Sequence, residues 1–314
     1  MVLDVMHLVR LIFVDPVRWL TSLAANKKQK LVKFYGGKTV LITGASSGLG
    51  EQLALELMKL SSEGGASPIN LVLSARTKTS LDLVAKNCMK LSPSSKVMVV
   101  PLDLSTLTDR RNVTDYMLSL NKNLKENGIS GVDCVINNAG VSSRGAALET
   151  EQSSLDMVMQ INFFGPVALT KALLPDMVAR GAGGAIGVIS SVQGRLGIPF
   201  RTSYAASKHA VQGYFDSLRG EISKAGISVS VISPGYISTA LSLNAVTGDG
   251  TKYGVTDETT KSGMDPAYAA KESLAAISDG VTDFILAEGK VSAAIQAKAQ
   301  FPQLLAKLLG KRSK

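Results

Sequence analysis

The chain of 314 residues has very few cysteines and histidines. Only Cys88 and Cys134 are present, and Cys134 lies in the apolar run 132–136, which is typical of a buried strand. We therefore expect two reduced core thiols in a reducing compartment. The two histidines, His7 and His209, are far apart in the sequence, and no Cys, His and acidic residues have metal-ligand spacing. The sequence predicts no bound metal.

The N-terminal part also lacks a charge-free apolar run of about 18 residues, which a membrane-spanning helix requires. Its first segment, 1–26, is hydrophobic but has no small-residue cleavage site after a clean apolar core, which argues against a secretory signal. The residues that interrupt this segment are Asp4, His7, Arg10 and Arg18. They fall near one helical face, and Trp19, the single tryptophan, follows them. This pattern predicts a helix lying in a membrane interface, with packing on the protein's own core as the alternative.

The net charge of +9 is concentrated at the two ends. Residues 1–38 carry seven basic and two acidic side chains, and residues 290–314 carry six basic and no acidic ones, whereas 39–289 is nearly neutral. A nucleic-acid-binding domain would carry its charge on the fold itself, so nucleic acid is not an expected partner. Basic, apolar ends instead predict that 1–37 and the amphipathic tail 291–314 both contact one anionic membrane surface. The alternative is that the ends pack on the globule or form a homodimer contact.

Between the ends, short apolar runs alternate with amphipathic stretches. The runs with strand-like length are Thr39–Thr43, Asn70–Ala75, Val97–Pro101, Asp133–Asn137, Ala185–Ser190, Ser228–Ser233 and Asp283–Ala287. The stretches with helical periodicity are Leu49–Leu60, Thr79–Leu91, Thr106–Glu126, Glu151–Ala179, Ser203–Ala225 and Pro266–Ser278. This alternation predicts an α/β fold over 38–290, with a doubly wound, Rossmann-type parallel sheet in three α/β/α layers. Ligands bind such sheets beyond the carboxyl ends of the strands.

A glycine-rich turn, G-x-x-x-G-x-G at 44–50, follows the first predicted strand and leads into a helix. Glycines allow a sharp turn and a close approach to a pyrophosphate, and the helix N-terminus offers free N–H groups and a positive dipole end. The turn therefore predicts a dinucleotide site. The residues expected to contact the dinucleotide here are Gly44, Ser46, Ser47, Gly48, Leu49 and Gly50.

The second predicted strand lacks the acid that would bind the ribose 2′-hydroxyl of NAD. It ends instead at Ala75 and Arg76, and an arginine accommodates a 2′-phosphate. Ser46 and Ser74 are candidate hydroxyl donors to the same phosphate. The sequence thus predicts NADP(H), with a solvated surface side chain as the alternative interpretation of Arg76.

A tyrosine and a lysine, Tyr204 and Lys208, are spaced to share one face of a helix. A free tyrosine has a pKa of about 10, and a nearby cation lowers it, so Tyr204 is a candidate proton donor and acceptor. Ser191 follows a predicted strand and would hydrogen-bond the substrate carbonyl. Asn162 lies in an apolar helical stretch, where a buried amide needs partners. Holding a water or supporting Lys208 would supply them.

Together these motifs resemble the short-chain dehydrogenase/reductase superfamily, in that family's order and spacing over residues 38–290. The matching elements are the 44–50 turn, Asn137-Asn138-Ala139-Gly140, Asn162, Ser191, Tyr204-x-x-x-Lys208 and Pro234-Gly235. The resemblance implies catalytic roles for Asn162, Ser191, Tyr204 and Lys208. It also implies cofactor contacts by Asp103 near the adenine and by Asn138, Ala139, Gly140, Tyr204, Lys208, Pro234, Gly235, Ile237 and Thr239.

A closer resemblance, to the membrane-associated dehydrogenase/reductase family member 7B branch, rests on 253–257, 285–287 and the hydrophobic lead-in. It implies an NADP-dependent enzyme acting on CH–OH groups in lipid metabolism, interconverting a carbonyl and an alcohol on a lipophilic substrate. We expect it at an intracellular membrane, of the endoplasmic reticulum or peroxisome, with the cytoplasm as the alternative. The segment 236–262 should cover the substrate. Rival functions are a retinoid or steroid dehydrogenase and a nucleotide-binding membrane scaffold or sensor.

Overall fold

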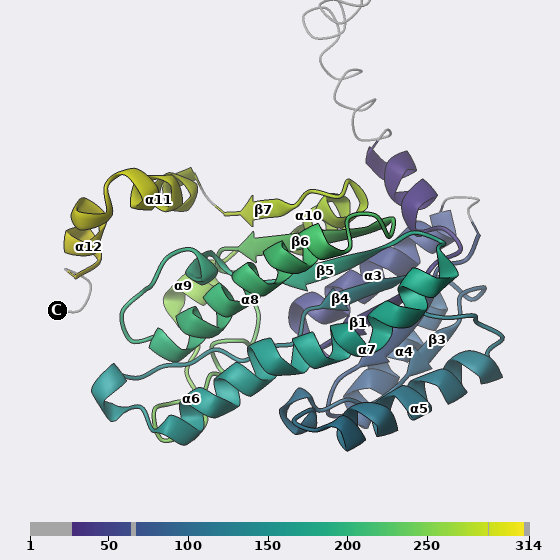
Figure 1. Ribbon diagram of the computed structural model, residues 1–314, viewed down its shortest axis with the longest axis horizontal. Coiled ribbons are helices and arrows are strands. Elements are labelled where there is room, and N and C mark those ends of the chain that lie inside the picture. The colour runs from purple at the N-terminus through teal and green to yellow at the C-terminus, as the bar shows by residue number, and fades with distance from the viewer. Residues whose placement is uncertain (1–26, 64–66, 288, 311–314) are drawn as a thin grey trace, which may run out of the picture.

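The computed structural model describes residues 27–63, 67–287 and 289–310, and a parallel sheet forms its centre (Figure 1). Its strands have the order β3-β2-β1-β4-β5-β6-β7, and every neighbouring pair is parallel. The strands are β1 (Thr39–Thr43), β2 (Asn70–Ser74), β3 (Val97–Val99), β4 (Cys134–Asn137), β5 (Gly184–Ile189), β6 (Ile227–Pro234) and β7 (Asp283–Leu286). Each predicted strand is therefore present, and the predicted doubly wound sheet is confirmed.

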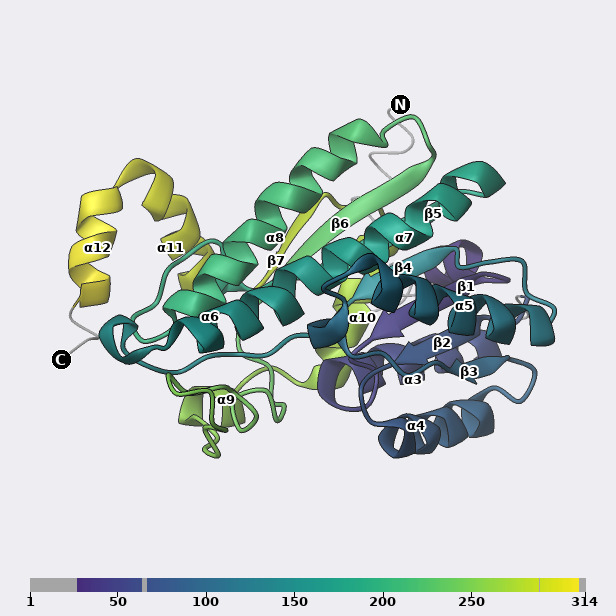
Figure 2. The same cartoon turned by 60° about the horizontal axis from the view of Figure 1, so that its bottom comes forward.

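Two layers of helices cover the sheet (Figures 1 and 2). One face carries α3 (Gly48–Glu63), α4 (Lys78–Leu91) and α10 (Pro266–Ser278). The other face carries α5 (Arg110–Glu126), α7 (Gly165–Arg180) and α8 (Thr202–Glu221). Because helices cover both faces, the central strands are buried along their length rather than at alternate residues, and all five residues of β1 are buried.

The order in which successive strands join the sheet reverses between β1 and β4: β2 and β3 lie on one side of β1, and β4 to β7 lie on the other. β1 pairs with β2 on one side and with β4 on the other, where Val40 is in register with Cys134. Helices that connect strands on either side of such a point diverge, which opens a crevice beyond the carboxyl ends. A hydrogen bond of 3.0 Å from the Asn138 backbone N–H to Thr43 Oγ1 joins the two strand ends there.

A 29-residue helix, Gln152–Arg180, crosses one face of the sheet. It comprises α6 (Gln152–Met159), a π-helical turn (Gln160–Phe164) and α7. Among the described residues it is the one helix long and apolar enough to cross a membrane by length and composition. Its own residues Leu169 and Leu173 are buried in the core against the sheet, so the helix packs as a core element of the α/β domain.

The start of the described chain packs on the domain. Residues 27–35 are helical, and Leu31 and Tyr35 are buried in the same core as α3 and α10. Tyr35 Oη donates a hydrogen bond of 3.0 Å to the Leu274 carbonyl. This part of the predicted membrane segment 1–37 therefore contacts the protein's own core. Residues 1–26, where the interfacial helix is predicted, lie outside the described residues.

At the other end, α11 (Gly289–Gln300) and α12 (Pro302–Gly310) stand beside the domain, past the carboxyl end of β7 (Figures 1 and 2). Lys298 Nζ donates a hydrogen bond of 2.7 Å to the Arg195 carbonyl in the turn after β5. Residues 27–35, in contrast, precede β1 and lie at the amino ends of the strands. The tail helices are thus the flanking elements that lie on the same side as the strand carboxyl ends.

Candidate active site

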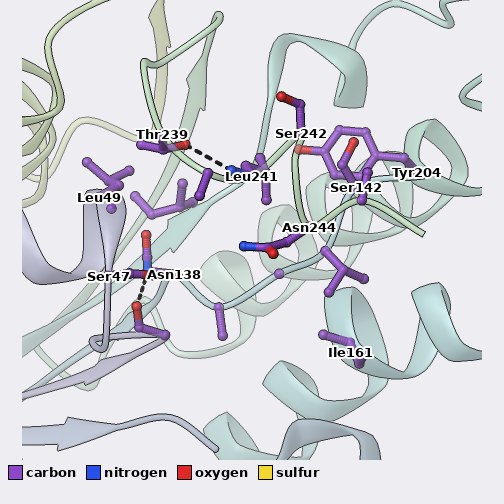
Figure 3. A pocket seen from close by; sticks show the side chains of 18 of the residues that line it. Ser47, Leu49, Asn138, Ser142, Ile161, Tyr204, Thr239, Leu241, Ser242 and Asn244 are labelled. Atoms are coloured by element: carbon purple, nitrogen blue, oxygen red, sulfur yellow. Dashed lines mark hydrogen bonds between the residues drawn. The ribbon is translucent and has the colours of Figure 1, made fainter. Parts of the chain in front are cut away.

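The carboxyl ends of the strands border a cavity of about 610 Å³ (Figure 3). The predicted site residues that line it are Gly44, Ser46, Ser47, Gly48, Leu49, Arg76, Asp103, Asn138, Ala139, Gly140, Ser191, Tyr204, Lys208, Pro234, Gly235, Ile237 and Thr239. Ser47 and Leu49 lie on one side of the view and Tyr204 on the other. Gly50 and Asn162 do not line the cavity but lie behind its wall, against Gly44 and Gly140 respectively.

The glycine-rich turn is packed so closely that two of its positions accept no side chain. Gly44 has a φ of +66°, and a Cβ there would lie 2.8 Å from the Ala139 Cα. A Cβ on Gly50 would lie 2.2 Å from the Gly44 carbonyl oxygen. The turn therefore brings bare backbone to the cavity wall, and α3 begins there at Gly48 with free N–H groups. Backbone amides and a positive helix end in this place fit a pyrophosphate.

Two of the predicted cofactor residues form hydrogen bonds that shape the cavity wall. The Asn138 side-chain amide donates to the carbonyl oxygens of Thr43 (2.9 Å) and Gly44 (3.4 Å), which fastens the glycine turn to β4. Asp103 Oδ1 accepts hydrogen bonds from the Ser105 N–H (2.9 Å) and hydroxyl (2.7 Å). Both side chains border the cavity, and within the chain their hydrogen bonds hold the neighbouring backbone in place.

The hydrogen bonds at the end of β2 bear on which side chains could bind a 2′-phosphate. Ser74 is fully buried, and its hydroxyl donates to the Val100 carbonyl at 2.7 Å and lies 2.9 Å from Tyr116 Oη. Ser74 also borders the cavity, but its hydroxyl already has these two partners in the core, which disfavours it as a phosphate donor. Arg76 is exposed at the cavity rim, and Ser46 is half-buried on the same wall.

The start of α8 brings the tyrosine and the lysine together. Tyr204 and Lys208 are 6% and 4% exposed, and Lys208 Nζ lies 5.8 Å from the Tyr204 ring centroid. Lys208 Nζ also donates a hydrogen bond of 2.9 Å to the Ile189 carbonyl at the end of β5. Burial lowers the pKa of Lys208 to about 8, because a dry site disfavours the ammonium.

The environment of the Tyr204 phenol contains cations that the sequence pattern did not predict. Burial raises the pKa of Tyr204, and a hydrogen bond with Ser191 lowers it. Two further positive groups, Arg144 and Arg201, also lower the pKa of this phenol. Arg144 lines the cavity. In the sequence, the one signal for it is its position shortly after the Asn-Asn-Ala-Gly motif.

Asn162 lies in the π-helical turn, and the residues that follow the turn explain why it forms. Pro166 has no N–H, and the Gly165 N–H bonds instead to Gln160, five residues back. The Asn162 amide accepts from the Val141 N–H at 2.8 Å and donates to its carbonyl at 2.9 Å. It also donates to Ser207 Oγ at 2.9 Å. The partners of the buried amide are thus Val141 and Ser207 rather than Lys208 itself, and the amide ties the loop after β4 to the helix that carries Lys208.

The segment 236–262 borders the cavity on the side of Tyr204. Its lining residues include Leu241, Ser242, Asn244 and Val246, three of which are labelled in Figure 3. A short helix, α9 (Glu258–Lys261), lies within this segment and was not predicted. Gln193, in the turn after β5, also lines the cavity and is 6% exposed, and its amide oxygen has no hydrogen-bond partner among the described atoms.

The low pKa of Lys208 makes a prediction about the pH dependence of turnover. If the ammonium is required, kcat/KM for carbonyl reduction should fall as the pH rises through about 8, because the free enzyme then loses this proton. Lys208→Arg should move the fall to higher pH, since a guanidinium stays protonated. The matched control, Lys86→Arg on the exposed side of α4, should leave the profile unchanged. An unmoved alkaline limb in Lys208→Arg would assign that limb to another group.

Comparison with known proteins agrees with this geometry. A family model described as short chain dehydrogenase matches residues 38–249. The chain is 42% identical to dehydrogenase/reductase SDR family member 7B of Danio rerio, over 88% of this chain and 86% of that protein. A short-chain dehydrogenase/reductase from Burkholderia phymatum, solved in complex with NAD, has a TM-score of 0.72 at 21% identity and covers 86% of this chain and 96% of its own.

A second solved structure carries the other cofactor. It is a short-chain dehydrogenase from Sphingobium yanoikuyae in complex with NADPH, with a TM-score of 0.67 and 25% identity over 86% of this chain and 95% of that one. The shared fold therefore accommodates either nicotinamide cofactor in different members. The match of the family model and the identity to a full-length relative lead to one conclusion: the chain belongs to the short-chain dehydrogenase/reductase family, in the branch of family member 7B.

Proposed function

We propose that this protein is an NADP(H)-dependent oxidoreductase that interconverts a carbonyl and an alcohol on a lipophilic substrate. The observation that carries the proposal is the convergence of Ser191, Tyr204 and Lys208 on one cavity whose other end is the glycine-rich turn. A nucleotide-binding scaffold would need the turn but not this buried constellation of proton-exchanging groups.

The residues at the two ends of the cavity fit a nicotinamide dinucleotide phosphate. The glycine turn and the start of α3 would hold the pyrophosphate, and Arg76 with Ser46 the 2′-phosphate. Lys208 would bind ribose hydroxyls, and Ile237 and Thr239 would lie near the nicotinamide carboxamide. When bound, NADPH supplies the hydride to the carbonyl carbon.

Tyr204 supplies the proton in the direction of reduction. Burial raises the pKa of its phenol, so the proton stays bound until the substrate oxygen becomes basic. Ser191 would hold that oxygen beside the phenol. The Lys208 ammonium has a pKa of about 8 and lies 5.8 Å from the Tyr204 ring centroid, so at neutral pH it would favour the phenolate that remains after the transfer, together with Arg144 and Arg201.

The lipophilic nature of the substrate is inferred from the cavity wall around Tyr204. Ile161, Leu241 and Val246 contribute apolar surface to the cavity, beside polar residues of the same region such as Ser242 and Asn244. The apolar side chains would contact the apolar body of a substrate whose one reacting carbonyl lies beside Tyr204.

The test is NADPH oxidation by the purified full-length protein with a panel of lipophilic ketones and aldehydes, run beside hydrophilic aldehydes. We expect turnover with members of the lipophilic set and loss of that turnover in Ser191→Ala. No NADPH oxidation with any carbonyl would favour the scaffold instead. Turnover confined to the hydrophilic set would retain the oxidoreductase but contradict the lipophilic substrate.

We further infer that the α11–α12 pair contacts a lipid surface beside the cavity. Phe301 and Leu304 are each 58% exposed, next to the basic residue Lys307 of α12. The pair follows the carboxyl end of β7, on the same side of the sheet as the cavity. A lipophilic substrate leaving a membrane there would reach the active site without crossing bulk water.

Vesicle co-sedimentation tests this contact. The full chain should bind anionic vesicles, and less at high salt, because each basic residue near the surface contributes only about 1 kcal/mol, and salt screens this contribution. Phe301→Ser combined with Leu304→Ser should lower binding while leaving NADPH affinity intact. The matched control is Leu83→Ser, an exposed apolar residue of α4. Equal binding by the double variant and the unmodified chain would exclude α12 as the contact.

A further inference from the structure

Three charged residues from distant parts of the chain meet beside Tyr204, and we call them the Arg144 cluster: Arg144, Arg201 and Asp257. Arg144 belongs to the loop after β4, Arg201 is the residue before α8, and Asp257 precedes α9 in the segment that borders the cavity. Their side chains are only 10%, 13% and 18% exposed.

Both guanidinium groups bind the same carboxylate oxygen. Asp257 Oδ2 accepts hydrogen bonds from Arg144 Nη2 at 2.6 Å and Nε at 3.2 Å, and from Arg201 Nη2 at 3.0 Å. Burial raises the pKa of Asp257, but its hydrogen bonds to the two arginines hold it below the ordinary value, so the carboxylate is ionised at neutral pH. One positive charge therefore remains in excess, and a poorly solvated unpaired charge is costly to maintain.

Two energetically unfavourable features lie at the Arg201 side of the cluster. Arg201 Nε is buried without a hydrogen-bond partner among the described residues. The preceding residue, Phe200, has a φ of +63°, which is unfavourable for a bulky side chain, and its carbonyl accepts from the Gly145 N–H at 3.1 Å. Backbone strain of this kind persists where the surrounding structure imposes it and is common beside active sites.

The cluster is connected to the tyrosine by a short chain of hydrogen bonds. Arg144 Nη1 donates to the Ser142 hydroxyl at 2.6 Å and to the Ser143 carbonyl at 2.8 Å. Ser143 Oγ in turn accepts from the Tyr204 backbone N–H at 3.1 Å. Arg201 lies near Tyr204 along the chain itself, because it is three residues before Tyr204 at the start of α8. Burial and hydrogen bonding thus fix both arginines around the first turn of α8.

We propose that Arg144, Arg201 and Asp257 are positioning residues for Tyr204: their excess positive charge favours its phenolate, and their hydrogen bonds hold the start of α8 against the loop after β4. The inference rests on the proposed acid/base role of Tyr204. Other charged or titratable groups that border the phenol or its cavity are Lys208 on its own helix, Tyr236 after β6 and Lys252 in the segment that carries Asp257. Both arginines act against burial, which raises the pKa of the phenol.

The composition of the cluster allows a test in which charge and structure predict different results. Removing an arginine charge should raise the pKa of Tyr204, whereas removing the Asp257 charge should lower it, because the second arginine charge is then no longer offset. A merely structural role predicts the same direction of change, or none, for both losses, since each breaks the same hydrogen-bonded unit.

The measurement is a pH titration by nuclear magnetic resonance of the full-length protein with isotope-labelled tyrosine. The chain has seven tyrosines, and the Tyr204 signal is the one missing from Tyr204→Phe. We expect Arg201→Gln to raise the pKa of Tyr204 by about 0.5–1 unit. This is less than the effect of an unpaired neighbouring charge, because Arg201 is paired with Asp257. Asp257→Asn should lower the pKa of Tyr204 by a similar amount. Arg201→Lys should restore the original value. Arg111→Gln, at an exposed site on α5, should change nothing.

Each outcome bears on the proposal. Opposite shifts in the two variants support it, and shifts of the same sign, or none, overturn it. Should Arg201→Gln not fold, Asp257→Asn alone decides, since an unchanged or raised pKa in that variant contradicts the electrostatic role. The titration needs neither substrate nor NADPH, so its result is separate from the proposed function, which fails instead if Tyr204→Phe retains normal turnover.

Discussion

Tyr204→Phe is expected to lower turnover by about 10²–10⁴-fold while NADPH still binds with nearly normal affinity. The substitution keeps the aromatic ring, which packs in a site that is only 6% exposed, and removes the hydroxyl that would protonate the substrate oxygen. Since Lys208 and the glycine turn are untouched, the groups expected to hold the cofactor remain in place. The loss should therefore appear in kcat rather than in the dissociation constant for NADPH.

Stopped-flow or steady-state NADPH oxidation measures the rate, and a fluorescence titration measures cofactor binding. Tyr214→Phe is the matched control, because Tyr214 lies on the same helix and packs its ring edge-on against Phe163 and Phe215. It should retain normal turnover. A near-normal kcat in Tyr204→Phe would mean that another group transfers the proton and that Tyr204 is not the acid/base residue.

Arg76→Ala should weaken NADPH binding roughly tenfold to 150-fold and leave NADH binding almost unchanged. Only NADPH carries the 2′-phosphate, and loss of a charge-assisted hydrogen bond costs about 1.5–3 kcal/mol. Because the Ser74 hydroxyl is already hydrogen-bonded in the core, we assign this phosphate to Arg76 and Ser46. The selectivity should therefore depend mainly on one arginine.

Calorimetric titration of both cofactors into both proteins provides the comparison. Lys86→Ala, which removes a positive charge farther along α4, controls for a general loss of attraction to the more negative cofactor. The assignment of Arg76 is wrong if the unmodified protein binds NADH as tightly as NADPH, or if Arg76→Ala weakens both equally.

The fold and the meeting of Tyr204 with Lys208 were predictable because their signals are local. Strands buried on both faces appear as short apolar runs, and the pair Tyr204 and Lys208 needs only four residues of helix to meet. The Arg144 cluster had no such signal, because Arg144 and Asp257 are 113 positions apart and Arg201 lies between them. Only the tertiary fold brings them together.

Two other features show where a sequence pattern is ambiguous. Ser74 was interpreted as a phosphate ligand because of its place at the end of a strand, but the pattern did not show that its hydroxyl bonds to Val100 in the core. Leu31 and Tyr35 belong to an apolar helical stripe, which looks alike whether it faces lipid or protein. In the structure their partners are α3 and α10.

The adjacency of β1 and β4 has a consequence for how the chain folds. Their pairing joins Val40 to Cys134, so the centre of the sheet cannot form until a loop of more than ninety residues has closed. Contacts of such high sequence separation slow folding. The expected cofactor site lies across this junction, where Asn138 fastens the glycine turn to β4. A dinucleotide held there would bind only the closed sheet, so cellular NADP(H) would shift the balance toward the native state and act as a ligand that assists maturation.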